Sequence, residues 1–164
     1  SHYGAEASLF FGSGFAANSA LFATLPQTGD LLLYDAFIHA SVHDGMKLGR
    51  ARFQPFPHND CNALEQAIRV WRASGGTGTV WIAVESLYSM DGDRAPLADL
   101  TRIADSHDAM LVIDEAHAVG VFGAREHRAM FGTDKRSPCE CCIDVQPHAE
   151  VVCDRCNVIE WVNC

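Results

Sequence analysis

The chain has 164 residues, of which 48% are hydrophobic and 20% are charged, as is typical of one globular domain with a buried core. Its formal net charge of −9 argues against nucleic acid or an anionic membrane as the main partner. We find no apolar run long enough to span a bilayer and no signal-peptide pattern. We therefore expect a cytoplasmic protein that works without nucleic acid or membrane.

Short apolar runs alternate with helix-forming segments along the first three quarters of the chain. The expected strands cover residues 7–11, 31–34, 53–56, 79–84 and 109–113. The expected helices follow Gly14, cover residues 40–48 and 63–73, and begin near Pro96. Strands that alternate with helices require crossover connections, so the pattern predicts an α/β fold with a mostly parallel sheet and flanking helices.

The segment FFGSGFAANSALFATL, residues 10–25, places two glycines before a helix-forming run. Free amides and a positive dipole at the start of a helix favour an anion, so we expect an anion site there. Gly12, Gly14 and Ala17 also match the dinucleotide pattern G-x-G-x-x-A, and Asp35 lies near the position of the ribose-binding acid. A dinucleotide-binding module is therefore an alternative, and a glycine turn that only allows close packing is another.

The segment LVIDEAHAVGVFG, residues 111–123, places Asp114 and His117 after a buried strand. Open α/β sheets bind ligands at such strand ends. The letters DEAH also occur in helicases, but those need a phosphate loop ending in G-K-[ST]. The two lysines, Lys47 and Lys135, lie in no such loop. The other interpretation is a pyridoxal phosphate site, in which a buried carboxylate pairs with the protonated pyridine nitrogen.

Two further segments follow strands: FIHASVHDG, residues 37–45, and ESLYSMDGD, residues 85–93. In their order and spacing, the four segments resemble the α-oxoamine synthases, which are pyridoxal phosphate enzymes of the aspartate aminotransferase fold. The resemblance covers about residues 3–123. It implies that the chain is the first half of the large domain of a fold type I enzyme.

The resemblance also implies a role for each matching residue. Backbone amides at Gly14 and Phe15 would meet the cofactor phosphate, and His39 would stack on the pyridine ring. Ser89 would lie beside the ring oxygen, Asp114 would pair with the ring nitrogen, and His117 would lie near the ring hydroxyl. These six positions are the expected cofactor contacts, and His39, Asp114 and His117 are the expected catalytic residues.

The reaction implied by the resemblance is the decarboxylative condensation of an amino acid with an acyl-CoA thioester, as in biotin biosynthesis. Pyridoxal 5'-phosphate would be the cofactor, and the parent protein would be a homodimer. The sequence departs from the family in one respect. A Schiff-base lysine is expected about thirty residues after the DEAH segment, whereas Lys135 comes too early and Lys47 follows His39. An inactive truncated fragment is therefore a further alternative.

The composition changes after about residue 124. Six of the seven cysteines lie in residues 125–164, and only Cys61 precedes them. Cys153 and Cys156 have the C-x-x-C spacing of zinc sites, but no second pair has finger or ribbon spacing. We therefore predict two parts: residues 1–124, a partial cofactor-binding domain, and residues 125–164, a cysteine-rich tail that is disordered or unrelated to the family. We predict no metal site.

Overall fold

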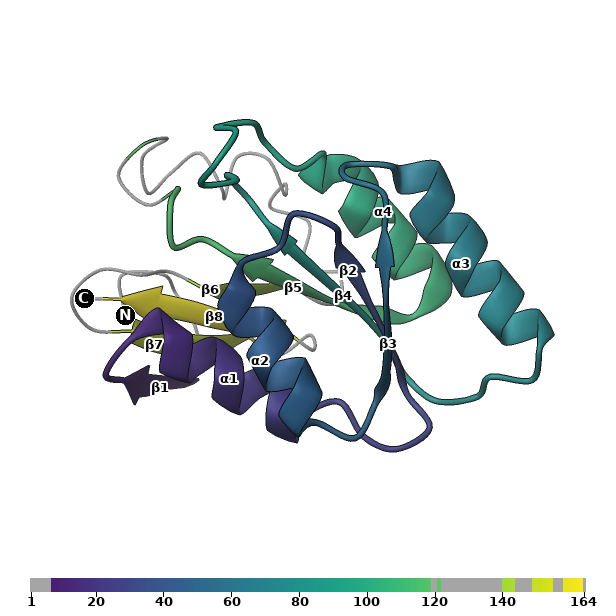
Figure 1. The fold of residues 1–164 in the computed structure, drawn as a ribbon, viewed down its shortest axis with the longest axis horizontal. Coiled ribbons are helices and arrows are strands. Elements are labelled where there is room, and N and C mark those ends of the chain that lie inside the picture. The colour runs from purple at the N-terminus through teal and green to yellow at the C-terminus, as the bar shows by residue number, and fades with distance from the viewer. Residues whose placement is uncertain (1–6, 119–120, 122–139, 144–148, 155–157, 164) are drawn as a thin grey trace.

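The computed structural model describes residues 7–118, 121, 140–143, 149–154 and 158–163. In this part of the chain, helices pack on both faces of one twisted sheet (Figure 1). The helices are α1 (Gly14–Thr24), α2 (Ala40–Leu48), α3 (Cys61–Ala73) and α4 (Leu97–His107). The strands are β1 (Ala7–Phe11), β2 (Leu31–Asp35), β3 (Arg52–Phe56), β4 (Val80–Glu85), β5 (Ala109–Asp114), β6 (Glu140–Ile143), β7 (Ala149–Asp154) and β8 (Val158–Asn163).

The sheet has the strand order β1-β7-β8-β6-β5-β4-β2-β3. The run from β3 through β2, β4, β5 and β6 is parallel, β8 pairs with β6 in parallel, and β7 pairs antiparallel with both β1 and β8. The predicted α/β fold with a mostly parallel sheet is confirmed. Residues 125–164 contribute β6, β7 and β8, and their separation from the family-like part stays a prediction.

Alternate residues of the central strands face opposite sides of the sheet, which gives two hydrophobic cores. Leu31 and Leu33 belong to the core beneath α3 and α4, whereas Leu32 belongs to the core beneath α1 and α2. Strand β4 divides in the same way, because Ile82 joins the first core and Trp81 the second. Burial on both faces explains why these strands read as continuous apolar runs rather than as alternating patterns.

Helices α1 and α2 approach each other closely at Gly45. A Cβ atom there would lie 2.9 Å from the backbone oxygen of Asn18 and from Cβ of Phe22. Such distances are shorter than van der Waals contact, so the position requires glycine. The close packing sets the distance between two residues that become important below, Asn18 on α1 and Ser41 on α2.

Most element boundaries differ from the sequence prediction by one or two residues, and one group of differences matters for function. Strands β2, β4 and β5 each extend by one residue to include an acid, namely Asp35, Glu85 and Asp114. Parallel pairing causes part of this extension, because Glu85 is the register partner of Asp114. The two acids therefore lie side by side at the carboxyl edge of the sheet.

Candidate cofactor site

Asp114 ends β5 and its residue is only 4% exposed. Its Oδ2 accepts a hydrogen bond from Asn18 Nδ2 at 2.9 Å, and its Oδ1 accepts one from the Ala116 amide at 2.9 Å. Burial raises the pKa of the Asp114 carboxyl, although these two hydrogen bonds act in the opposite direction. The donors are neutral groups, so an ionised Asp114 would gain from a cation placed at the strand end.

His39 lies at the start of α2, where its side chain caps the helix. Its Nδ1 lies 2.8 Å from Ser41 Oγ and accepts a hydrogen bond from the Ser41 amide at 3.3 Å. Ser41 Oγ in turn accepts from Asn18 Nδ2 at 2.8 Å. A continuous chain of hydrogen bonds therefore connects His39, through Ser41 and Asn18, to Asp114.

His117 lies in the turn after β5, near His39. The two imidazole ring centroids are 6.4 Å apart, and the His117 side chain is 41% exposed. The structure thus brings together the three residues predicted as catalytic, because His39 is linked to Asp114 and adjoins His117. Their chemical roles stay predictions.

Glu85 is a site residue that the sequence analysis did not select. The residue is 1% exposed, and the backbone amides of Ser89 and His39 act to lower the pKa of its carboxyl group. His117 Nδ1 lies 3.3 Å from Oε2, an ion-pair distance without hydrogen-bond geometry. Burial raises the pKa of Glu85 to about 8, and the charge of Asp114 acts in the same direction. At neutral pH Glu85 is therefore mostly an uncharged acid, next to the backbone of two predicted site residues.

The predicted phosphate loop lies at the start of α1. Ser13 caps this helix, and its Oγ accepts from the Ala16 amide at 3.2 Å. Helix geometry leaves the Gly14 and Phe15 amides without intrahelical acceptors, as an anion requires. Gly14 lies one helical turn before Asn18, and the Asn18 side chain contacts Asp114. Helix α1 therefore brings its own start close to Asp114. Ser89 is exposed, in the loop after β4.

A second acid, Asp35, ends β2 and is fully buried. Its Oδ1 lies 2.8 Å from His58 Nδ1 and accepts from the Phe37 amide at 2.8 Å, while its Oδ2 accepts from the Asn59 amide at 2.9 Å. Protein donors therefore engage both oxygens. Asp35 has three such partners and is 0% exposed, whereas Asp114 has two donors and is 4% exposed. Asp35 is therefore the less able of the two to receive a ligand hydroxyl, which weakens the dinucleotide alternative.

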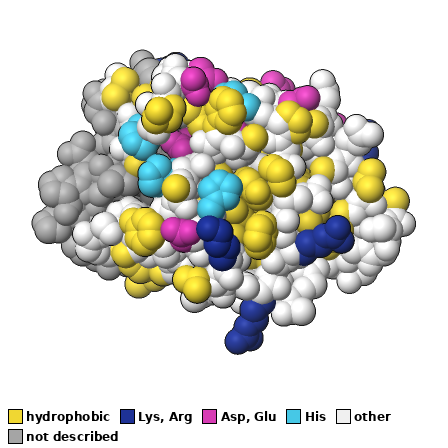
Figure 2. Space-filling view, in the orientation of Figure 1, with side chains coloured by type: hydrophobic (Ala, Val, Ile, Leu, Met, Phe, Trp, Pro, Cys, Tyr) yellow, Lys and Arg dark blue, Asp and Glu magenta, His cyan; other side chains and the backbone are white. Residues whose placement is uncertain are grey.

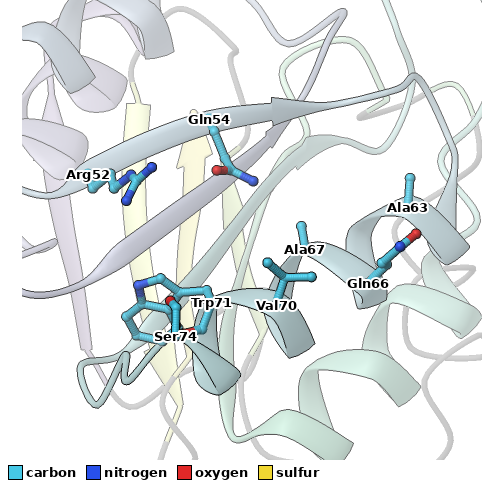
Figure 3. A pocket seen from close by; sticks show the side chains of 8 residues that line it. All are labelled: Arg52, Gln54, Ala63, Gln66, Ala67, Val70, Trp71 and Ser74. Atoms are coloured by element: carbon cyan, nitrogen blue, oxygen red, sulfur yellow. Dashed lines mark hydrogen bonds between the residues drawn. The ribbon is translucent and has the colours of Figure 1, made fainter.

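Other features of the described residues lie apart from this cluster. A cavity of about 330 Å³ lies between β3 and α3, and none of the predicted site residues lines it (Figure 3). Several histidine side chains reach the surface in Figure 2, with acidic side chains nearby. Lys47 is exposed and pairs with Asp44 at 3.1 Å, whereas Lys135 lies outside the described residues.

Neither a metal-binding cluster nor a membrane-spanning helix occurs among the residues that the structure describes. In that part of the chain, no group of three or more histidine, cysteine, aspartate or glutamate side chains is arranged to hold a metal ion. The cysteine side chains considered for zinc lie outside that part. No helix in the described ranges combines the length and apolar character needed to cross a membrane.

Comparison with known proteins places this geometry in a family context. The family model for aminotransferase class I and II matches residues 1–153. An 8-amino-7-oxononanoate synthase of Chromobacterium violaceum is 49% identical over 120 residues, which are 73% of this chain and 30% of the relative. The Emericella nidulans protein of that name is 42% identical over 133 residues, covering 75% of this chain and 32% of the relative. The chain thus spans about a third of the length of the curated relatives it matches.

Solved structures agree with the predicted fold type. A serine palmitoyltransferase from S. paucimobilis with bound PLP superposes with a TM-score of 0.74 at 26% identity, covering 94% of this chain and 39% of that one. An 8-amino-7-oxononanoate synthase from Francisella tularensis gives a TM-score of 0.66 at 29% identity, covering 87% of this chain and 40% of that one. The comparisons thus agree with the family resemblance inferred from the four sequence segments.

Proposed function

Because the chain belongs to the aminotransferase class I and II family, we propose that it is the cofactor-binding part of a pyridoxal phosphate-dependent C-acyltransferase. The proposed parent reaction is the decarboxylative condensation of an amino acid with an acyl-CoA thioester, most simply alanine with a pimeloyl thioester in biotin biosynthesis. The basis for this choice is the similarity to 8-amino-7-oxononanoate synthases.

The observation that carries the proposal is the environment of Asp114. This acid is buried at the carboxyl end of a central strand, its hydrogen-bond donors are neutral, and burial raises its pKa. A protonated pyridine ring is a flat cation whose N–H can donate to such a carboxylate. This environment of Asp114 therefore fits pyridoxal phosphate. When bound, the cofactor supplies an electron-accepting ring to the reacting carbon.

The other residues have complementary tasks in this proposal. Asp114 keeps the proton on the ring nitrogen, because an ionised carboxylate raises the pKa of a nearby cationic acid. With the cofactor bound, His39 would pack against the ring face, and His117 would lie beside the ring edge. The free amides of Gly14 and Phe15 bind the phosphate. Glu85 lies beside the backbone amides of His39 and Ser89, which act to lower the pKa of its carboxyl group.

We further propose that the parent protein is a cytoplasmic homodimer and that neither Lys47 nor Lys135 is its Schiff-base lysine. Lys47 pairs with Asp44 in the last turn of α2, far along the helix from its capping residue His39. The isolated chain should therefore bind pyridoxal phosphate without a covalent bond. Borohydride reduction followed by mass spectrometry should find no stoichiometric lysine adduct, whereas an adduct at Lys135 would show that the tail supplies the lysine.

A chimera tests the proposed reaction directly. The matched 120 residues of the Chromobacterium violaceum relative would be replaced by those of this chain, and product formation would be measured with alanine and pimeloyl-CoA. Turnover that Asp114→Asn abolishes would support the proposal. A chimera that folds and binds pyridoxal phosphate but condenses serine with a long-chain acyl-CoA instead would retain the enzyme class and reject the biotin assignment. A folded chimera that binds no cofactor would reject both.

A further inference from the structure

The hydrogen-bond chain between Asp114 and His39 passes through two side chains that are almost completely buried. Asn18 is 2% exposed and Ser41 is 1% exposed. Asn18 Nδ2 lies 2.9 Å from Asp114 Oδ2 and 2.8 Å from Ser41 Oγ, and Ser41 Oγ lies 2.8 Å from His39 Nδ1. Three elements meet here, because these residues belong to α1, the start of α2 and the end of β5.

The direction of each hydrogen bond follows from the chemistry of the groups. An ionised Asp114 accepts only, so the Asn18 amide must present its NH₂ group to it. That NH₂ group has a second hydrogen, which it donates to Ser41 Oγ. Ser41 then has its own hydroxyl hydrogen left to donate, and His39 Nδ1 is the neighbour at hydrogen-bond distance.

A second observation shows that Nδ1 is an acceptor. The backbone amide of Ser41 also points at His39 Nδ1, at 3.3 Å. A protonated Nδ1 would place two N–H groups against each other and would leave the Ser41 amide without this acceptor. In a neutral imidazole one nitrogen donates and the other accepts, so an accepting Nδ1 requires the hydrogen on Nε2.

We propose that Asn18 and Ser41 are positioning residues that hold His39 as the neutral Nε2–H tautomer. His39 then offers a hydrogen-bond donor at Nε2, suited to a carboxylate or carbonyl oxygen of a ligand. The use of this donor by a substrate rests on the proposed function. The tautomer itself does not, because the hydrogen-bond chain forms without any ligand.

Histidine tautomers can be measured in the chain itself. Two-bond proton–nitrogen NMR spectra of the chain labelled with ¹⁵N-histidine distinguish Nε2–H from Nδ1–H. His39→Gln assigns the His39 signals among those of the eight histidines. The spectra should be recorded at alkaline pH, where the imidazoles are neutral. We expect the Nε2–H pattern for His39 in the unmodified chain.

Substitutions at Ser41 test whether the hydrogen-bond chain selects this tautomer. Ser41→Ala should reduce the preference for Nε2–H by about tenfold, the factor for one well-formed hydrogen bond. Ser41→Cys, whose S–H is a weaker donor of similar size, should give an intermediate preference. Asn18→Leu should also weaken it, because Ser41 Oγ loses its donor. A matched control is Ser19→Ala, which removes a buried hydroxyl on α1 that has no hydrogen-bond partner.

The outcomes separate this inference from the proposed function. An Nδ1–H pattern in the unmodified chain, or an unchanged tautomer in folded Ser41→Ala and Ser41→Cys, would overturn the inference. Backbone amide spectra of each variant establish that it is folded. Pyridoxal phosphate is then added, and a change in the His39 signals would support the proposed site. If the cofactor does not bind while the Ser41 series behaves as expected, the proposed function fails and the tautomer assignment stands.

Discussion

Asp35 ends β2 and Asp114 ends β5 of the same sheet, and both residues are buried. The two carboxylates differ in the groups that contact them. Asp35 contacts an imidazole that is itself held by a second acid, because His58 Nδ1 lies 2.8 Å from Asp35 and Nε2 lies 2.7 Å from Asp93. Burial alone would lower the pKa of His58, but its hydrogen bonds to Asp35 and Asp93 and their charges raise it. Asp114 instead has an amide from Asn18 and the Ala116 backbone as donors.

The difference separates a structural acid from one suited to a ligand. A buried charge that has its own counterion strengthens the fold only as long as both partners remain. A buried acid held by neutral donors is costly to ionise, and a cation from outside can recover that cost. On this basis Asp35 connects β2 to the segments after β3 and β4, whereas Asp114 is the residue prepared for a cofactor.

The largest expected effect is on stability and comes from Asp35→Ala. This change leaves His58 and two backbone amides without their acceptor, so it should lower the free energy of unfolding by about 3–5 kcal/mol. Urea titration measures this change. Asp99→Ala is the control, because the ion pair of Asp99 with Arg102 has side chains 58% and 66% exposed and should contribute less than about 1 kcal/mol. A small effect of Asp35→Ala would remove the basis for calling this network structural.

Asp114→Asn should reverse that pattern. The free energy of unfolding should change by no more than about 1 kcal/mol, because removal of a costly buried charge offsets one weakened hydrogen bond. The affinity for pyridoxal phosphate should fall about 30-fold, since the bond to a charged acceptor is lost. Absorbance titration measures the binding. Unchanged affinity together with a large loss of stability would place Asp114 in the same class as Asp35.

The pH dependence of stability should reveal His58. Its pKa is raised in the folded protein, so its contribution is complete below the unfolded pKa of about 6.5 and disappears as the pH rises through the folded value. The groups that face its ring are Asp35, Asp93, Asn59, Tyr88 and Phe37. His58→Gln should therefore remove part of the decline in stability toward alkaline pH.

The control for His58→Gln is His107→Gln. His107 pairs with Glu65 at 3.1 Å, and its side chain is 18% exposed compared with 20% for His58. Glu85 also has a raised pKa and contributes a decline of the same sign, but it is present in all three proteins and cancels in the comparison. Identical pH profiles for His58→Gln and the unmodified chain would mean that His58 is not held as an imidazolium.

The sequence was sufficient to predict those features that depend on local patterns. Continuous apolar runs identified the central strands, and the acid after residue 113 marked a strand end that could bind a ligand. Glu85 ends β4 in the same way, yet its importance depends on parallel register with Asp114. Register is set by tertiary packing, so a local pattern does not reveal it.

Long-range partners were equally hidden. The sequence does not single out Asn18 as a partner of Asp114, because their hydrogen bond joins residues 96 positions apart. The close approach of α1 and α2 at Gly45 places Asn18 beside Ser41, and nothing in either segment alone indicates that contact. No local sequence pattern pointed to His58, because the two acids that contact it, Asp35 and Asp93, come from different parts of the chain.

The smallest expected effect comes from His117→Asn. This change tests whether side-chain exposure and hydrogen-bond geometry distinguish the role of His117 from that of His58. His117 is 41% exposed and contacts Glu85 at 3.3 Å without hydrogen-bond geometry, so its loss should change the free energy of unfolding by less than about 0.5 kcal/mol. Its proposed place beside the cofactor ring predicts a roughly fivefold loss of affinity for pyridoxal phosphate, the effect of one modest hydrogen bond. Urea and absorbance titrations of the same sample measure both quantities. A stability loss as large as that of His58→Gln would mean that Glu85 and His117 form a second structural pair, and the distinction between the two carboxylate networks would then rest on Asp114 alone.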